Sequence, residues 1–220
     1  MIQLLTCEII DVRGFKPAIL GMRNPMNSWN KSDSVLCKGP RKDDFDKDIF
    51  CVGENDMKLM KSLCEAGTEH RKYLRMIQVW MDITAPLYWW KQFDTYKVGV
   101  IANSCSTMHK IADKEFTLKD FSYEHLELTY PLKCLDQTIH VLNIEREKYL
   151  KTKDKNHWWQ MIQLLPSSYN QKRTVMLNYE VVLRIIEQRT NHKLDEWNQL
   201  IDTLYTLPYV KELTKQKRSR

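Results

Sequence analysis

The sequence lacks the cysteine and histidine patterns that bind structural metals. Its 220 residues include six cysteines and six histidines, but no CxxC pair, no HExxH motif and no clustered His/Asp spacing. A tetrahedral zinc site needs such closely spaced ligands, so we expect no structural zinc site. No secretion signal accompanies the cysteines, and we therefore expect free thiols rather than a disulfide framework.

Long hydrophobic runs are also absent. No uninterrupted apolar stretch approaches the roughly 20 residues that cross a membrane as a helix. The first residues do not follow the order of a signal peptide, in which basic residues precede an apolar segment and a small-residue cleavage site. Together these absences predict a cytoplasmic protein without a membrane partner.

The net charge of +6 is concentrated at one end of the chain. Residues 211–220 carry five lysines and arginines and one glutamate, which accounts for +4 of the total. Basic tails of this kind are usually solvated, so we expect a disordered tail over about 211–220. The rest of the chain is nearly neutral and gives no indication of a nucleic-acid groove.

The composition is that of an ordinary globular domain. Apolar residues make up 43% and charged residues 28% of the chain, which is typical of globular proteins. No internal repeat, low-complexity block or Gly/Ser linker divides the sequence, so we expect one domain over residues 1–220. The apolar periodicities predict an α-rich fold with a small sheet.

The expected elements follow from apolar spacing and from helix start and stop signals. Alternation of apolar and polar residues predicts strands at 1–10 and 77–83. Helical spacing predicts helices at 14–22, 54–67, 68–75, 86–94, 132–151, 156–165, 174–189 and 194–205. Between them, Asn24–Phe50 has prolines, glycine and a charge run, and we expect a long loop that acts as a lid.

The stretch that follows the 77–83 strand combines paired tryptophans with cations. Pro86 suits the first turn of a helix, and Trp89 and Trp90 precede Lys91, Gln92, Tyr96 and Lys97. Lysines, an amide and a phenol beside indole rings can hold a phosphate and stack on a flat ring. In the alternative interpretation, the tryptophans belong to the core and the lysines are solvated.

Two further stretches carry candidate binding groups. On a helix over 174–189, Asn178, Ile185 and Arg189 share one face, which suits a long ligand with polar ends or simply a half-exposed amphipathic helix. In the preceding loop, Ser167 and Ser168 with Lys172 and Arg173 could form a phosphate site, with Tyr169 stacking on a base. The alternative is that this loop only caps the following helix.

Several short stretches follow one another in the order and spacing of a known family. They are His70 before the 79–83 strand, Ala85-Pro86, Lys91-Gln92, Thr95-Tyr96-Lys97, Asn103 to Met108, and Leu165-Pro166 followed by Asn178 and Arg189. In this pattern, residues from about His70 to Gln199 resemble the flavin-dependent thymidylate synthases (ThyX). That family has Ala-Pro, Gln, an Arg-His-Arg signature, an NExSxR motif and a later Leu-Pro, Asn and Arg.

The departures from the family pattern concern mostly arginines. Thr95-Tyr96-Lys97 stands in the place of Arg-His-Arg, Ser104 replaces the glutamate of NExSxR, and Met108 replaces its arginine. Glu180 and Gln199 stand where two further family arginines would fall. Methionine, glutamate and glutamine do not replace the bidentate fork of arginine on a phosphate.

The resemblance implies a ThyX-like fold of the α/β (α+β) class, α-rich with a small central antiparallel sheet. It also implies FAD as cofactor, a dUMP-like pyrimidine nucleotide as substrate, and a homotetramer with pockets between subunits. Residue by residue, it implies catalytic roles for Ser106 and Gln92 and cofactor contacts for His70, Tyr96, Lys97 and Asn178. Substrate contacts are expected for Lys91, Gln92, Asn103, Ser104, Ser106, Lys172, Arg173 and Arg189.

Three functions remain open at this point. The first is a divergent flavin-dependent transferase that acts on a pyrimidine nucleotide. The second is a catalytically inactive protein that binds or sequesters a nucleotide. The third is an oligomeric interaction protein with Trp89, Trp90, Trp158 and Trp159 at its interfaces, where aromatic residues are enriched.

Overall fold

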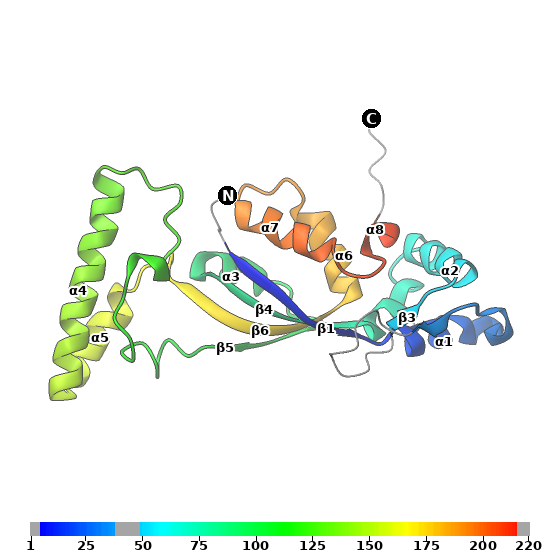
Figure 1. Ribbon diagram of the computed structural model, residues 1–220, viewed down its shortest axis with the longest axis horizontal. Coiled ribbons are helices and arrows are strands. Elements are labelled where there is room, and N and C mark those ends of the chain that lie inside the picture. The colour runs from blue at the N-terminus through cyan, green and yellow to red at the C-terminus, as the bar shows by residue number, and fades with distance from the viewer. Residues whose placement is uncertain (1–4, 38–48, 215–220) are drawn as a thin grey trace.

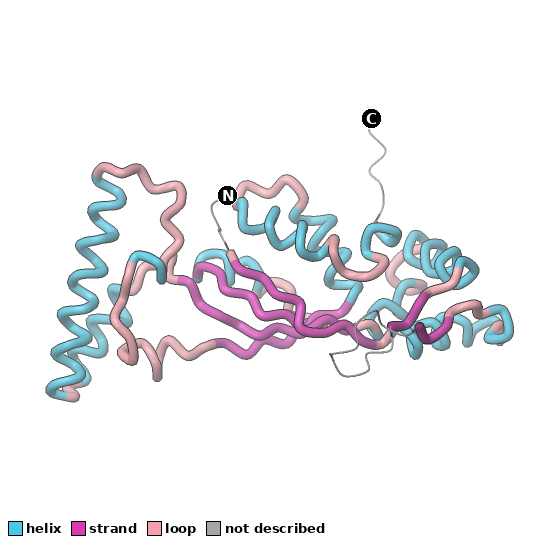
Figure 2. Tube along the Cα trace, viewed as in Figure 1, coloured by secondary structure: helices cyan, strands magenta, loops and turns pink. Residues whose placement is uncertain are grey.

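The computed structural model describes residues 5–37 and 49–214. Its strands are β1 (Thr6–Arg13), β2 (Val35–Cys37), β3 (Ile49–Cys51), β4 (Gln78–Pro86), β5 (Val100–Ser104) and β6 (Asn170–Asn178). Its α-helices are α1 (Phe15–Arg23), α2 (Glu54–Glu65), α3 (Leu87–Phe93), α4 (Tyr130–Thr152), α5 (Lys155–Leu164), α6 (Tyr179–Arg189), α7 (Asp195–Leu204) and α8 (Val210–Leu213). This arrangement confirms the expected α-rich fold with a small antiparallel sheet (Figures 1 and 2).

The central sheet has the strand order β1-β4-β6-β5, and every pairing in it is antiparallel. On β4, Val79, Met81, Ile83 and Ala85 are buried, whereas the residues between them are half-buried. The period-two pattern expected for this strand is therefore confirmed. Helices α6 and α7 lie over one face of the sheet, and the described part of the chain places no helix over the middle of the other face (Figure 1).

The sequence pattern predicts one helix over 174–189, but the structure has a strand followed by a helix there. Residues 170–178 form strand β6, which pairs with β4 on one side and with β5 on the other, and the helix begins only at Tyr179. Val175 and Leu177 point into the core while Lys172 and Thr174 are exposed. A central position between two strands favours the β-branched pair Thr174-Val175 over helical spacing. Lys172 and Arg173 thus belong to a strand and not to a phosphate-binding loop.

The main core lies between the sheet and the helices above it. Trp89, Trp90 and Trp197 are fully buried there. The ring centroids of Trp89 lie 4.9 Å from those of Trp90 and 4.8 Å from those of Trp197. The interpretation of the paired tryptophans as core is therefore correct, and their expected place at a subunit interface is wrong, since the chain itself covers them.

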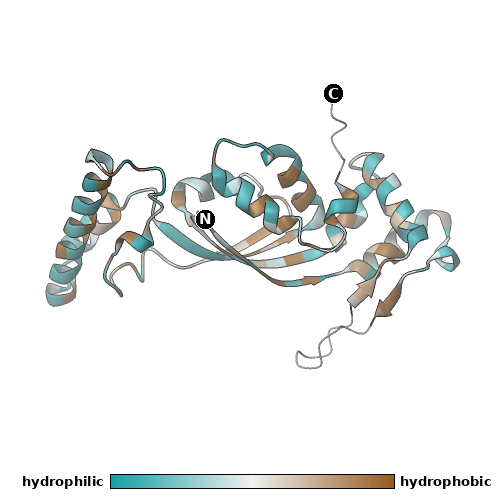
Figure 3. Cartoon of the chain, turned by 45° about the horizontal axis from the view of Figure 1, so that its top comes forward, coloured by the Kyte–Doolittle hydropathy of each residue, from teal (hydrophilic) through white to brown (hydrophobic). Residues whose placement is uncertain are grey.

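A second apolar cluster lies between α4, α5 and the loop 111–121. The two helices lie at one end of the sheet (Figure 1). The cluster brings Leu135, Ile139 and Leu142 of α4 together with Met161 of α5 and with buried residues of the loop 111–121. Helix α4 is hydrophilic over much of its length with scattered hydrophobic residues (Figure 3), as expected for a helix that buries one narrow face. The helix pair thus carries its own small core.

The segment Asn24–Phe50 is more ordered than the expected loop, as far as it is described. It contains short 3-10 helices at Asn24–Met26 and Trp29–Lys31 and the paired strands β2 and β3. Cys37 and Cys51 form a disulfide with a Cα–Cα distance of 6.0 Å, so the expectation of free thiols is wrong for these two residues. Strand pairing brings them together, which spacing in the sequence does not show. The charge run at 41–48 lies outside the described residues.

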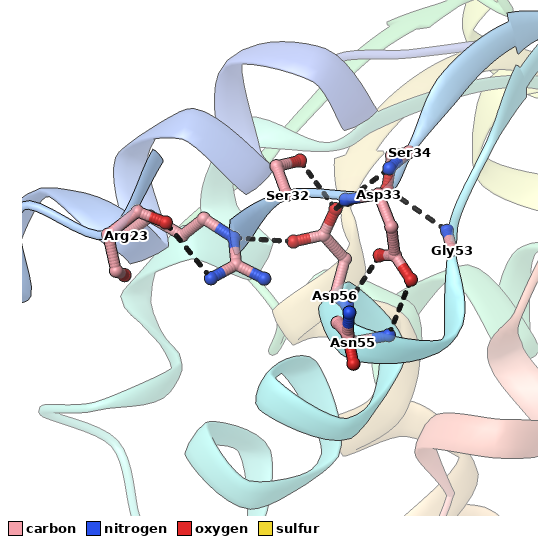
Figure 4. Close-up of polar contacts among 8 residues, drawn as sticks. Arg23, Ser32, Asp33, Ser34, Gly53, Asn55 and Asp56 are labelled. Atoms are coloured by element: carbon pink, nitrogen blue, oxygen red, sulfur yellow. Dashed lines mark hydrogen bonds and ion pairs between the residues drawn. The ribbon is translucent and has the colours of Figure 1, made fainter. Parts of the chain in front are cut away.

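A buried carboxylate fastens this segment to the first two helices (Figure 4). Asp56 of α2 is 0% exposed and accepts a hydrogen bond from Nε of Arg23 at 2.6 Å. The hydroxyl groups of Ser32 and Ser34 donate to the same carboxylate at 2.6 and 2.5 Å. Asp33 in turn accepts hydrogen bonds from the backbone N–H groups of Asn55 and Asp56. These groups lie in the first turn of α2, where the helix itself provides no acceptor for them. This part of the expected lid is packed scaffold.

The two ends of the chain differ from the expected bounds. The first strand runs from Thr6 to Arg13 instead of over residues 1–10, and residues 1–4 lie outside the described part. Val210–Leu213 forms α8, and Leu213 is buried, so the disordered tail does not begin at 211; residues 215–220 are not described. No helix in the described ranges has the length and apolar character needed to cross a membrane.

Candidate functional site

A group of polar and aromatic side chains surrounds Arg189, the last residue of α6. Its Nε donates a hydrogen bond to the hydroxyl oxygen of Tyr96 at 3.0 Å, and its Nη1 lies 3.5 Å from Oε1 of Gln92. The guanidinium carbon lies 4.6 Å from the ring centroid of Trp197, a distance typical of a cation–π contact. Trp197 Nε1 donates to Gln92 Oε1 at 3.0 Å, which fixes that amide. The turn after α3 and the start of α7 thus meet at Arg189.

The contact between Arg189 and His192 has an unusual property. The backbone N–H of Leu194 donates to Nδ1 of His192 at 3.0 Å, so the hydrogen of the neutral ring belongs on Nε2. That Nε2 lies 3.2 Å from Nη1 of Arg189. Burial, and then the positive charge of Arg189, lower the pKa of His192, which keeps the ring neutral near pH 7. Two N–H donors therefore face each other, and an acceptor oxygen between them would satisfy both.

A second arginine reinforces the positive charge at this place. The guanidinium carbon of Arg184 lies 5.4 Å from the ring centroid of Tyr96, and that of Arg189 lies 5.6 Å from the same centroid. Nε of Arg184 is buried and has no hydrogen-bond partner. Within residues 5–37 and 49–214, neither arginine forms an ion pair with a carboxylate. We call Arg184, Arg189 and His192, with Gln92, Tyr96 and Trp197, the cationic cluster.

Ser106 lies in a different part of the molecule, in the loop that follows the edge strand β5. Its hydroxyl oxygen accepts a hydrogen bond from the backbone N–H of His109 at 3.1 Å. The neighbouring Cys105 is tied to β6, because its N–H donates to the carbonyl of Lys172 at 2.9 Å and its carbonyl accepts from Nε2 of Gln171 at 2.8 Å. The loop that carries Ser106 is thus tied to the backbone of β6, whereas Gln92 belongs to the cationic cluster.

Lys172 and Arg173 do not act together, because neighbouring residues of a strand point to opposite faces. Lys172 lies on the open face of the sheet, where its Nζ is 2.5 Å from Oδ2 of Asp82. Arg173 points to the helix side: its Nη1 pairs with Asp94 at 2.8 Å, and its guanidinium carbon lies 4.3 Å from the centroid of Trp90. The expected phosphate site, in which Ser167 and Ser168 join both Lys172 and Arg173, is therefore not formed within one chain, because the two cations lie on opposite faces of the sheet.

The remaining expected residues are spread over the surface, with one exception. Lys91, Lys97 and His70 are exposed, as are Asn103 and Ser104 on the edge strand β5. Asn178 is buried, and its side-chain oxygen accepts a hydrogen bond from the N–H of Val181 at 3.0 Å, which caps α6. Of the residues expected from the sequence, the structure brings Gln92, Tyr96 and Arg189 together at one place.

Arg184, His192 and Trp197 are the members of the cationic cluster that sequence reasoning missed. One signal was present: His192 follows Arg189 by three residues, a spacing that brings side chains together when the chain remains helical or turns tightly. Arg184 and Trp197 join the cluster only through the packing of α6 against α7 and the turn after α3, which no local pattern reveals.

Comparison with solved structures places this geometry in a known fold. No protein-family model matches the chain, and no curated protein matches it. Thymidylate synthase X from Helicobacter pylori, solved with FAD and dUMP, superimposes with a TM-score of 0.68 at 15% identity, covering 96% of this chain and 97% of that one. A UMP/dUMP methylase, PolB from Streptomyces cacaoi, bound with 5-Br UMP, superimposes with a TM-score of 0.60 at 12% identity, covering 92% and 87%. The chain therefore has the fold of the flavin-dependent thymidylate synthases.

Proposed function

We propose that this protein binds a pyrimidine nucleotide and holds its phosphate at the cationic cluster. One observation carries the proposal: Arg184 and Arg189 both lie against the ring of Tyr96, His192 contacts Arg189, and neither arginine forms an ion pair with a carboxylate in the described ranges. A cluster of this charge is unfavourable unless an anion joins it. Proteins of the same fold have been solved with dUMP and with 5-Br UMP, which supports a nucleotide as that anion.

The chemistry of the cluster suits a phosphate group. A phosphate oxygen between Arg189 and His192 accepts a hydrogen bond from each and separates the two facing donors. Nε of Arg184, buried and without a partner, supplies a further donor. Trp197 and Gln92 hold the guanidinium of Arg189 in place, so that little side-chain freedom is lost on binding.

We also propose that the complete site requires a second copy of the chain, in a homo-oligomer that we take to be a tetramer. Ser106 lies in a loop tied to the backbone of β6, on which Lys172 lies, whereas Gln92 and Arg189 belong to the cationic cluster, so that there are two groups of candidate residues. Residues that contact one nucleotide must come from both groups if the resemblance is right, and neighbouring copies can supply them. The open sheet face supports this assembly, since Trp80, Met176 and Ile101 lie side by side on it and Ile101 is 62% exposed.

Flavin is a weaker fit than the nucleotide within one chain. Of the four residues expected to hold it, Tyr96 is buried against Phe93 and Trp197, and Asn178 caps α6. His70 and Lys97 are exposed and remain available to a ligand. Flavin binding therefore needs residues from a second copy, and we propose FAD only for the assembled oligomer.

A nucleotide-sequestering protein without redox chemistry is the second candidate. Two observations favour it over an active transferase. The hydroxyl oxygen of Ser106 accepts a hydrogen bond from the loop backbone, and the uncharged Met108 stands where the resembling family has an arginine. The visible absorbance of the purified protein separates the two candidates, because a flavoprotein is yellow and a nucleotide-sequestering protein is colourless.

Calorimetric titration with dUMP tests the proposal. The parent protein is expected to bind dUMP, and Arg189→Met is expected to weaken binding about ten- to a hundredfold, the effect of losing one charge-assisted hydrogen bond. Arg13→Met is the matched control, because Arg13 is exposed, pairs with Asp11 and is not a member of the cluster. Unchanged affinity in Arg189→Met, with an unchanged melting temperature, would contradict the proposal.

The proposed oligomer is tested by light scattering at micromolar protein concentration. A molecular mass equal to that of a monomer would contradict the proposed assembly.

A further inference from the structure

A pocket lies between the loop that follows β5 and the junction of α4 with α5. Its volume is about 470 Å³, and it is lined by Met108, His109, Tyr149, Lys153, Lys155 and Trp158. Pockets that hold small molecules have volumes of roughly 300–1,000 Å³, so this one is large enough for a mononucleotide. Its lining shares no residue with the cationic cluster.

Aromatic rings form the apolar part of the pocket. Nε1 of Trp158 donates a hydrogen bond to the carbonyl of Met108 at 3.0 Å, which ties α5 to the loop and fixes the indole. The ring of Trp158 also meets that of Trp159 edge-on, with centroids 4.8 Å apart. Because its N–H is already used, Trp158 offers a ring face and no donor. A flat heterocycle can stack on such a surface.

The polar part of the pocket is positively charged. Nζ of Lys153 lies 5.7 Å from the ring centroid of Tyr149, and Nζ of Lys155 lies 5.8 Å from that of Trp159. Neither lysine forms an ion pair with a carboxylate in the described part of the chain. Both lysines line the pocket, and their charges are available to an anion there.

Lys153 occupies a backbone conformation that disfavours it. It ends α4 with φ 58° in the left-handed region, where glycine or asparagine is the usual residue. Its side chain lines the pocket. A lysine at this position costs conformational energy, and strain of this kind is often found at binding sites.

We propose that this pocket binds a nucleoside monophosphate, separately from the cationic cluster. The base stacks on Trp158 and Tyr149, and the phosphate pairs with Lys153 and Lys155. Because stacking on a ring face accepts any base, the pocket takes purine as well as pyrimidine nucleotides. The inference rests on the pocket alone and does not depend on the proposed pyrimidine site.

AMP is the probe that tests this inference. In calorimetric titrations of the full-length protein, we expect AMP to bind the parent, with adenosine and inorganic phosphate each binding more weakly. Replacing both Lys153 and Lys155 by methionine keeps the aliphatic part of each side chain and removes the charges. This double variant is expected to have an affinity for AMP at least about tenfold lower than that of the parent. Lys151→Met, an exposed lysine of the same helix outside the pocket, is the matched control and should bind AMP as the parent does.

Lys153→Gly separates binding from folding. Glycine favours the left-handed backbone at this position, so this variant is expected to melt at a higher temperature and yet to bind AMP more weakly. Arg189→Met should leave AMP binding unchanged. This variant therefore distinguishes a failure of the pocket hypothesis from a failure of the proposed nucleotide binding at the cationic cluster. AMP affinity that is equal in the parent and in the double methionine variant would overturn the inference, as would no AMP binding by the parent.

Discussion

Gly99 and Asn178 approach so closely that residue 99 has no room for a side chain. A Cβ atom on Gly99 would lie 2.4 Å from Nδ2 of Asn178, and Gly99 has φ +85°. Asn178 cannot easily move away, because its side-chain oxygen caps α6. The turn that leads from Tyr96 to β5 therefore depends on glycine at this position.

Gly99→Ala is expected to destabilise the protein by about 2 kcal/mol or more, through the strained backbone and the contact with Asn178. Gly67→Ala is the matched control: Gly67 has φ +111° but no atom within 4 Å of the position of a Cβ. Its cost is conformational alone, about 1 kcal/mol. Chemical denaturation of the two variants measures the difference. Equal losses would show that the contact with Asn178 relaxes freely.

Asp56→Asn is expected to cost about 3 kcal/mol of unfolding free energy or more, because it leaves the guanidinium of Arg23 buried without its counter-charge. Arg23 is only 4% exposed, so water does not replace the lost partner. Asp11→Asn serves as control, since its ion pair with Arg13 is exposed and contributes at most about 1 kcal/mol. A loss of similar size in both variants would refute the assigned importance of the buried pair.

The same carboxylate makes stability depend on pH in the acid range. Burial acts to raise the pKa of Asp56, but hydrogen bonds from Ser32, Ser34 and Arg23 outweigh burial and lower it. A lowered pKa in the folded state contributes stability above the unfolded value of about 3.9, and this contribution disappears as the pH falls through the folded pKa. The difference in unfolding free energy between the parent and Asp56→Asn should therefore shrink below about pH 4. A difference that stays constant down to pH 2 would contradict this.

Nucleotide binding at the cationic cluster should take up a proton through His192. Burial and the charge of Arg189 lower the pKa of His192, against the opposing charge of Glu196, and a bound phosphate beside Nε2 would raise it again. The added proton would occupy Nδ1 and displace the hydrogen bond from the N–H of Leu194. Affinity for dUMP should then rise as the pH falls from about 8 to 6, the region in which histidine titrates. His192→Gln keeps an N–H donor but cannot be protonated. The phosphate of dUMP titrates in the same way with both proteins, so its effect cancels in the ratio of parent affinity to variant affinity. A ratio that does not change with pH would show that His192 takes up no proton on binding.

Much of the fold could be predicted because its elements have clear local patterns. The alternation along Val79, Met81 and Ile83 has the period of a strand with one buried face, and the apolar spacing of α4 marks a long helix. One of the two interpretations of Trp89 and Trp90, that they belong to the core, is confirmed. In each case the residues that decide the structure are close together in the sequence.

The segment around Asn178 shows why the rest could not be predicted. Leu177, Val181 and Ile185 recur every four residues, yet Leu177 lies in strand β6, which ends at Asn178, and Val181 lies in helix α6, which begins at Tyr179. Both sides of that junction bury apolar residues against one core, so the helical period continues by coincidence across a change of structure. Arg184 and Trp197 joined the cationic cluster in the same way, through tertiary packing and not through spacing.

The separate apolar cluster between α4, α5 and the loop 111–121 has a consequence for how the protein opens. A helix pair with its own small core can unfold as a unit while the sheet remains intact. Amide hydrogens in α4 and α5 should accordingly exchange through a subglobal opening, at a lower free energy than those of β4 and β6. A ligand between α5 and the loop after β5 would slow exchange in this helix pair alone and leave the rate elsewhere unchanged.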